Sequence, residues 1–264
     1  MGLADLHIHS IHSHDGTASI PAILKYASEK TDLDVIAITD HDSLNGVKQA
    51  MDLAPKYGLQ VVPGCEISTA QGHLLGLFLH HSIPAGLSLI ETVLRIGEQG
   101  GLAIAAHPEA KGTSSLSFEN IRSALNHPFA RQILVGVEAF NGGLIYTRSN
   151  IPAVVNSSHL PISQTGNSDA HILTMIGKGA TYFPGTGIDD LRIALKQHQT
   201  HVASFGNLGA SQVITGYVPQ YLLRLLGWTI WNNDPSEPLK YARIHSLSLR
   251  SAKRAGDLVH QMTS

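Results

Sequence analysis

The sequence predicts an α/β fold, a distorted (β/α)7 TIM-like barrel followed by a C-terminal helical extension. Two observations predict it. Short apolar runs alternate with helix-like segments, and polar side chains able to bind a metal follow the ends of successive runs. In a barrel these strand ends converge on one face, where such folds carry their chemistry. We expect the barrel to span residues 1–206 and the extension to span residues 207–264.

Seven apolar runs rich in Val, Ile and Leu have the length and composition of buried strands. They are residues 34–42, 58–68, 73–79, 101–109, 133–141, 160–171 and 200–206. The alternation with helices favours a largely parallel sheet, either open or closed. The polar residues at the ends of the runs favour the closed form.

Helix-like segments lie between many of these runs, at residues 19–30, 88–100, 117–126 and 187–198. The first carries the expected start signals, because Ser19 is a candidate N-cap and Pro21 falls in the first turn.

Composition and charge exclude several classes of function. Cys65 is the only cysteine, so no intramolecular disulfide can form, and the first ten residues lack a basic and an apolar leader segment. We therefore expect a cytoplasmic protein. A net charge of −2 gives no overall attraction for duplex nucleic acid. The sequence has no P-loop, GxGxxG or GxSxG motif, which leaves nucleotide-triphosphate, dinucleotide and serine-hydrolase sites without support.

The extension differs in character from the body. Residues 1–209 carry 12 basic and 17 acidic residues, whereas residues 210–264 carry 6 and 3. Residues 217–231 hold one charge and two tryptophans, yet they are shorter than the roughly 20 residues of a membrane span. We expect helical structure that packs on the barrel or forms a homo-oligomer interface. We also predict a helix over residues 237–261 with five cations near one side. This side either faces solvent or contacts an anionic partner or membrane surface. The five cations are Lys240, Arg243, Arg250, Lys253 and Arg254.

Histidines gather in the stretch DLHIHSIHSHDG at residues 5–16. His7 and His9 are two residues apart, so on a strand they project to the same side. Asp169 and His171 repeat this spacing in SDAH, more than 150 residues later. The two pairs look like halves of one metal site, and imidazole and carboxylate ligands without thiolates suit Mn, Fe or Zn.

Six short motifs follow one another along the chain: DLHIHS, HDG, AITDHD, GCEIS, AAHPE and NSDAH. In this order they resemble the PHP family, named for its members among DNA polymerases and histidinol phosphatases. The resemblance covers residues 3 to about 205, and IGKGATYFPG is similar to a segment of stand-alone members. It implies a metal-dependent phosphoesterase with three divalent ions per chain and a small phosphorylated substrate.

The resemblance also implies nine metal ligands. The first ion would take His7, His9 and Asp169, with Glu66 bridging to a second ion held by His73 and His107, while the third would take Asp15, His41 and His171. The extra residue in SHDG, compared with the commoner SDG, makes Asp15 depart from the family pattern, and His80 and His81 are rivals of His73. His171 or His41 is a candidate proton donor if it is not fully committed to metal, and Glu66 joins them in the catalytic set.

Each of several other polar residues could have a functional or a purely structural role. Lys111, Arg148 and Lys178 either contact the phosphate or are ordinary surface charges. Asp5 and Asp40 neighbour candidate ligands, and they either orient imidazoles or make strand-end hydrogen bonds. Glu138 and Asn141 either line the pocket or serve strand-end packing and turn formation. His12 and His14 either face solvent, support the ligands from outside the metal site, or bind metal directly.

Three alternatives to a phosphomonoesterase stay open. An exonuclease acting on single strands would need a basic channel with stacking aromatics, which the net charge and 6% aromatic content disfavour. Hydrolysis of C–N bonds is a second alternative, because an activated hydroxide does not by itself select its target. A non-catalytic metal-binding regulatory domain is a third, and the complete ligand set disfavours it.

Overall fold

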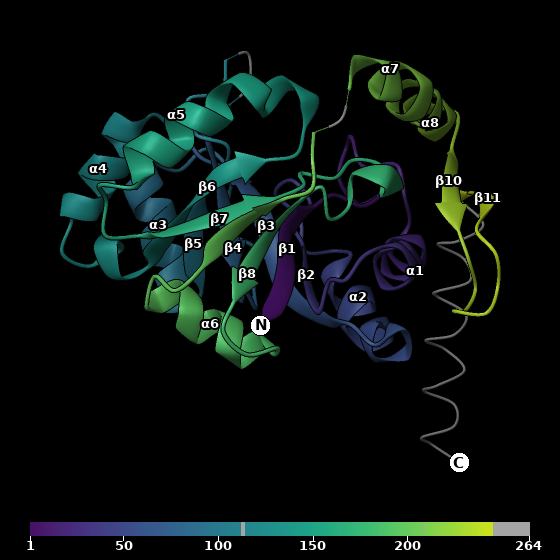
Figure 1. The fold of residues 1–264 in the computed structure, drawn as a ribbon, viewed down its shortest axis with the longest axis horizontal. Helices are drawn as coiled ribbons and strands as arrows, with labels where there is room; N and C mark the ends of the chain where they lie inside the picture. The colour runs from purple at the N-terminus through teal and green to yellow at the C-terminus, as the bar shows by residue number, and fades with distance from the viewer. Residues whose placement is uncertain (112–113, 208, 245–264) are drawn as a thin grey trace.

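The computed structural model describes residues 1–111, 114–207 and 209–244. Nine strands of these residues form one sheet in the order β7-β6-β5-β4-β3-β2-β1-β8-β9, with helices around it (Figure 1). The strands are β1 (Gly2–Ile8), β2 (Val35–Ile38), β3 (Gln60–Ser68), β4 (His73–Leu77), β5 (Leu102–Ala105), β6 (Leu134–Asn141), β7 (Ser163–Asn167), β8 (Gly179–Phe183) and β9 (His201–Ser204). Each of the seven predicted runs contains one of them.

The two ends of the strand order approach each other, so the sheet is nearly closed. Thr181 of β8 accepts a hydrogen bond from the Gly166 amide of β7 at 3.1 Å and donates one to the Gly166 carbonyl at 2.8 Å. Thr200, just before β9, donates to the carbonyl of Gln164 at 2.9 Å. Side-chain hydrogen bonds thus complete the barrel where no backbone ladder does, and the predicted α/β barrel is confirmed.

The barrel departs from an all-parallel TIM barrel because some of its strand pairs are antiparallel. Strand β4 runs antiparallel to both β3 and β5, and β8 runs antiparallel to both β1 and β9. Strand β8 lies outside the seven predicted runs, because GATYF has few of the aliphatic residues that mark the others.

Six helices belong to the barrel: α1 (Ile20–Lys30), α2 (Val47–Leu53), α3 (Leu89–Glu98), α4 (Phe118–Asn126), α5 (Thr147–Ser157) and α6 (Ile188–Lys196). Short 3-10 turns cover Ala54–Tyr57, Ala130–Gln132, Leu144–Tyr146 and Leu173–Met175. The predicted start of α1 is confirmed, since Ser19 Oγ accepts from the Ala22 amide and Pro21 lies in the first turn.

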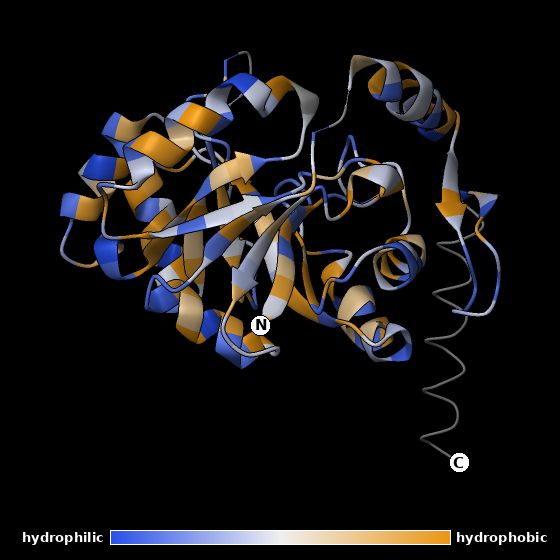
Figure 2. Cartoon of the chain, viewed as in Figure 1, coloured by the Kyte–Doolittle hydropathy of each residue, from blue (hydrophilic) through white to orange (hydrophobic). Residues whose placement is uncertain are grey.

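Apolar residues lie along the central strands (Figure 2) and pack against the helices in three clusters. One cluster joins α1 to β2, a second joins α3 and α4 to β3 and β4, and a third joins α6 to β8. These clusters hold the strands in place, so the side chains at the strand ends occupy fixed positions.

The C-terminal segment, residues 209–244, begins with one continuous helical stretch. It comprises α7 (Ala210–Gln212), a π-helical turn (Val213–Tyr217) and α8 (Val218–Leu225). No helix in the described ranges is long and apolar enough to cross a membrane.

The prediction of helix beyond this stretch is wrong for two pieces of the C-terminal segment. Strands β10 (Trp228–Trp231) and β11 (Lys240–Arg243) form an antiparallel pair. Gly227, with φ of 81°, ends the helix, and the strand pairing satisfies the backbone that follows. The other three predicted helix cations, Arg250, Lys253 and Arg254, lie outside the described residues.

Candidate metal centre

The nine predicted ligands gather at one end of the barrel, on elements that are far apart in sequence. They come from β1 and the loop after it, from β3, from the start of β4, and from the turns after β2, β5 and β7. Seven of them line one cavity, while His7 and His9 lie buried beneath it. The structure thus brings the whole predicted set together.

Glu66 of β3 stands at the centre of the cluster and is almost completely buried. Five imidazole nitrogens surround its two oxygens: His7 Nε2 and His9 Nε2 at 3.2 Å and His41 Nδ1 at 3.3 Å from Oε2, and His73 Nδ1 at 2.9 Å and His107 Nε2 at 3.0 Å from Oε1. Each oxygen faces its own group of imidazoles, which is the arrangement of a carboxylate that bridges two ions.

Asp169 closes the group on the far side of His7 and His9. Its Oδ1 lies 3.3 Å from His7 Nε2 and 3.2 Å from His9 Nε2. These two nitrogens therefore lie between the carboxylates of Glu66 and Asp169. The contacts match the composition expected for the first ion.

Asp15 makes the third group in spite of the extra residue in its motif. Its Oδ2 lies 2.9 Å from His171 Nε2 and 3.4 Å from His41 Nε2, and Ser13 Oγ donates to its Oδ1 at 2.6 Å. His9 also has a ligand atom within reach of this group. The geometry thus adds one imidazole to the set expected for the third ion.

Buried nitrogens without partners show that this donor set fits metal ions. His7 Nε2 and both ring nitrogens of His9 have no partner in hydrogen-bonding geometry, although both side chains are buried. An unsatisfied buried polar group costs on the order of 1–3 kcal/mol. Three overlapping groups place one ligand atom per residue within 4.8 Å of one another: His9, Asp15, His41 and His171; His7, His9 and Glu66; His41, Glu66 and His73.

Glu138 of β6 orients the His7 ring through Nδ1, the nitrogen that faces away from Glu66. Its Oε1 lies 3.0 Å from His7 Nδ1, and its Oε2 accepts from the His107 amide at 2.8 Å. Asn141 donates to Glu138 at 2.9 Å and to Asp169 at 3.2 Å. A carboxylate on the far nitrogen of a ligand imidazole fixes the tautomer and aims the other nitrogen at the metal. The sequence singled out Glu138 and Asn141, but not this contact.

Asp5 and Asp40 make strand-end hydrogen bonds, the second of the two roles considered for them, rather than orienting imidazoles. Asp5 accepts from the amides of Ser168 at 3.0 Å and Gly177 at 2.9 Å. Asp40 accepts from the amide and hydroxyl of Ser10 at 2.6 and 2.7 Å. Both carboxylates hold loops that carry candidate ligands. Burial raises the pKa of Asp5 to about 6.

The facing charges shift the pKa values in the cluster. Burial alone would raise the pKa of Glu66, but the charge of His7 and hydrogen bonds from imidazoles hold it well below its usual range. Burial alone would lower the pKa of His9, but Asp169 and Glu66 raise it to about 10. Without metal the cluster therefore retains protons that an incoming cation must displace.

Two candidate ligands have backbones that L residues rarely adopt. His107 has φ of 28° and Asp169 has φ of 51°. Such conformations persist where the surrounding contacts impose them, as they do at functional sites. Here the Glu138 bond to the His107 amide and the Asn141 bond to Asp169 supply those contacts.

Comparison with protein families agrees with the geometry. A PHP domain match spans residues 5–169, and a PHP-associated match spans residues 147–200. The chain belongs to the PHP family. The PHP match contains eight of the nine clustered residues, and the PHP-associated match contains the ninth, His171. Both matches end before the C-terminal segment.

Several proteins resemble this PHP chain. An uncharacterised protein of Methanocaldococcus jannaschii is 39% identical over 147 residues, which are 52% of this chain and 81% of that protein. A phosphoribosyl 1,2-cyclic phosphate 1,2-diphosphodiesterase of Eggerthella lenta is 33% identical over 35% of this chain and 37% of that enzyme. A 5'-3' exoribonuclease of Haemophilus influenzae is 31% identical over 41% of this chain and 40% of that enzyme.

A solved structure shares the fold. It is a two-domain protein of Bacteroides vulgatus containing a predicted PHP-like metal-dependent phosphoesterase. The TM-score is 0.62 at 19% identity, over 91% of this chain and 75% of that one. This likeness confirms the barrel of the PHP domain.

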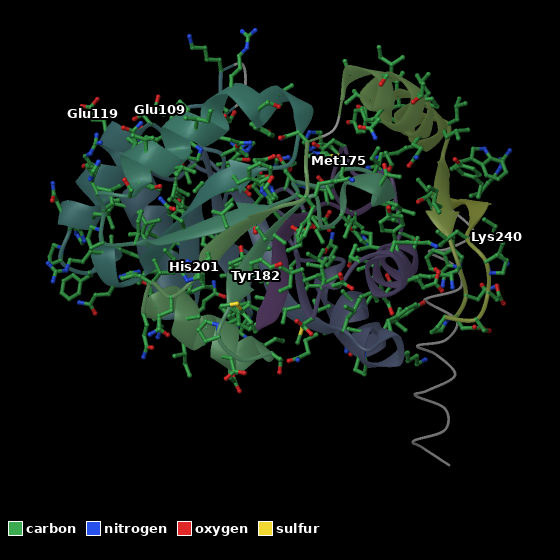
Figure 3. All side chains as sticks on the ribbon, in the orientation of Figure 1. Glu109, Glu119, Met175, Tyr182, His201 and Lys240 are labelled. Carbon is green, nitrogen blue, oxygen red and sulfur yellow. The ribbon has the colours of Figure 1, made fainter. Side chains whose placement is uncertain are left out.

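A cavity of about 630 Å³ lies above the cluster. Its floor is formed by the candidate ligands, and its walls include Ile145, Tyr146, Met175, Val213 and Tyr217. Figure 3 labels Met175, which lies on the side of the barrel nearest the C-terminal helices. The cavity thus combines a charged floor with apolar and aromatic walls.

The three cations singled out from the sequence are not among the residues that line this cavity. Lys111 and Arg148 are exposed, and Lys178 is half-buried. A role for them in binding phosphate stays a prediction. His12 and His14 are exposed; His14 lines the cavity and lies 3.7 Å from Asp15.

Proposed function

We propose that this PHP protein is a metal-dependent phosphoesterase that hydrolyses the phosphomonoester of a small metabolite or nucleotide. The observation that carries the proposal is Glu66, a buried carboxylate with five imidazole nitrogens within 3.3 Å. Membership of the PHP family supports a hydrolase of this type.

We propose a trinuclear site of Mn, Fe or Zn. Three contact groups support it, centred on the two oxygens of Glu66 and on Asp15. When bound, divalent ions would supply a hydroxide at neutral pH and neutralise charge on the phosphoryl oxygens. The proposed ligands are His7, His9, Asp15, His41, Glu66, His73, His107, Asp169 and His171.

Residues of this chain would hold the ions and their ligands in place. Glu66 would supply a ligand oxygen to each of two ions, and Glu138 would keep His7 Nε2 turned toward Glu66 and Asp169. The loop carboxylate of Asp15 would tie His171 and His41 to the third position. Because all these groups are fixed before substrate binds, little reorganisation is needed during the reaction.

His171 or His41 is the proposed proton donor to the leaving oxygen, whichever of the two is not fully committed to the third ion. Both line the cavity and are partly exposed, in contrast to His7 and His9 below them. Asp15 lies 2.9 Å from His171 Nε2, which positions the ring at the cavity floor. A donor at this place would face the leaving group rather than the buried side of the phosphate.

A phosphodiesterase is the second candidate function. The named activities of two relatives favour it, because one is a cyclic-phosphate diesterase and the other an exoribonuclease. The described lining of the cavity contains no Lys or Arg, whereas a long polyanionic strand would need a row of cations. We therefore place the monoester first.

The test is phosphate release by Mn-loaded protein from sugar phosphates, nucleoside monophosphates, a phosphodiester and a short single-stranded oligonucleotide. We expect release from a monoester and a loss of at least about 100-fold in Glu66→Gln. Glu98→Gln, an exposed change on α3, is the matched control. Activity on the diester or oligonucleotide alone would favour the second candidate. No release with metal bound would overturn both.

A further inference from the structure

The C-terminal segment is attached to the loop that carries Asp15, residues 9–19. Thr17 Oγ1 donates to the His171 carbonyl at 2.7 Å and lies 3.3 Å from Gln220 Oε1, and Arg224 donates to the carbonyls of His14 and Ser13. Farther along, the Ser19 amide donates to the Ile230 carbonyl at 3.1 Å, and Thr229 donates to Thr17 at 2.9 Å. The segment is therefore docked at the mouth of the metal centre.

Docking brings a π-helical turn to the cavity. Val213 and Tyr217, the first and last residues of that turn, both line it. The Tyr217 ring stands edge-on to the ring of His171, with centroids 6.1 Å apart and planes at 88°. Tyr221 stacks behind Tyr217 at 5.6 Å, which supports the ring from the side of the helix. π-Turns inside helices occur often at functional sites.

The rest of the cavity rim has similar chemistry. Tyr146 stacks on His107 with centroids 4.7 Å apart and planes at 11°. Ile145 is largely exposed at the rim, and Met175 packs in the same apolar cluster as Val213 and Tyr217. The described lining residues include no Lys or Arg, and the only acid among them outside the nine candidate ligands is Asp42, so most of the wall surface near Tyr217 consists of ring faces and methyl groups.

We propose that Tyr217 is a specificity-determining residue, whose ring packs against a planar, uncharged part of the substrate while the phosphoryl group lies at the metal cluster. This inference rests on the proposed function. A substrate with a second anionic group in its body would find no Lys or Arg on the described walls. Tyr217 also lies beyond residues 5–169 and 147–200, so the PHP match does not assign it a role.

The test uses the full chain loaded with Mn and two probes that differ by one group, adenosine 5′-monophosphate and ribose 5-phosphate. The variants are Tyr217→Ala and Tyr217→Phe, and Tyr241→Ala, at an exposed tyrosine on β11 outside the cavity lining, is the matched control. We expect Tyr217→Ala to raise KM for the nucleotide about 10-fold, in line with the loss of one aromatic stacking contact. Its kcat should stay within about 2-fold, and KM for ribose 5-phosphate should not change. Tyr217→Phe should resemble the parent on both probes.

Calorimetric binding of the same two probes separates this inference from the proposed function. If the parent hydrolyses neither probe but binds the nucleotide more tightly, and Tyr217→Ala abolishes that preference, the inference stands and the proposed function fails. If the parent shows no preference for the nucleotide, the inference is overturned. Equal weakening of both probes by Tyr217→Ala would also overturn it, because that outcome indicates a structural role.

Discussion

Glu138 and His7 form a buried pair in which the carboxylate Oε1 lies 3.0 Å from the imidazole Nδ1. Asn167 donates to the same carboxylate oxygen at 3.0 Å, so the acid is held independently of the imidazole. The pair leaves His7 Nε2 facing Glu66 and Asp169, where it has no hydrogen-bond partner. A contact outside the ligand set therefore fixes the orientation of a candidate ligand at the bottom of the site.

Replacing this carboxylate should weaken metal binding without removing a ligand. In Glu138→Gln the amide keeps the shape but loses the charge that fixes the His7 tautomer. We expect metal affinity to fall about 10- to 100-fold, the usual effect of removing such a partner. Calorimetric titration of metal-free protein with Zn²⁺ measures it. The exposed Glu98→Gln should behave as the parent, and unchanged affinity in Glu138→Gln would mean that His7 is oriented without the carboxylate.

Metal binding should release protons at neutral pH. The pKa of His9 in the metal-free fold is raised from 6.5 to about 10. Its proton therefore stabilises the metal-free fold fully below pH 6.5, and this stabilisation is lost as the pH rises through about 10. A cation must displace that proton, so metal affinity should increase with pH over this range. Calorimetry at pH 7.5 in two buffers of different ionisation enthalpy counts the protons, and a buffer-independent heat would contradict the expectation.

Much of the ligand set could be predicted from the spacing of residues within short segments. His7 and His9, like Asp169 and His171, are two residues apart, and strand geometry alone sets such pairs on one side. The prediction that these pairs gather around Glu66 depended on the resemblance to the family motifs. The contact between Glu138 and His7 joins residues 131 positions apart, and no local pattern encodes it. The only signal was a carboxylate within an otherwise apolar run.

The C-terminal segment shows where local patterns failed. Residues 217–231 have an apolar periodicity typical of a helix, and α8 confirms its first part. Strand β10 then pairs with β11, and its Ile230 bridges to Ala18, so tertiary contacts decide the structure after Gly227. β-Structure of this kind depends on partners far along the chain, which a single sequence does not reveal.

Closure of the barrel should depend on the absence of a side chain at Gly166. A Cβ there would lie 2.5 Å from the Ala180 carbonyl oxygen of β8. Backbone must move to relieve such a contact, so Gly166→Ala should lower the free energy of unfolding by about 3 kcal/mol. Gly136→Ala on β6 is the control, since its Cβ would meet the Ile104 side chain at 3.2 Å. Urea denaturation compares them, and equal losses would mean that the approach of β7 to β8 is not tight.

The outer face of the C-terminal helices should form a homo-oligomer contact, one of the two kinds of packing that the sequence allows for this segment. Ile214, Leu222 and Leu225 are exposed by 65%, 54% and 65%, while Val213 and Tyr217 face the cavity. Apolar side chains at this spacing along one helix face are typical of subunit contacts. We expect the parent to sediment as an oligomer and the double variant Leu222→Lys, Leu225→Lys to sediment as a monomer. Ile193→Lys, at an exposed position on α6, should leave the oligomer intact. A monomeric parent would rule out this interface, and phosphate release by the monomeric variant would show whether each cavity works alone.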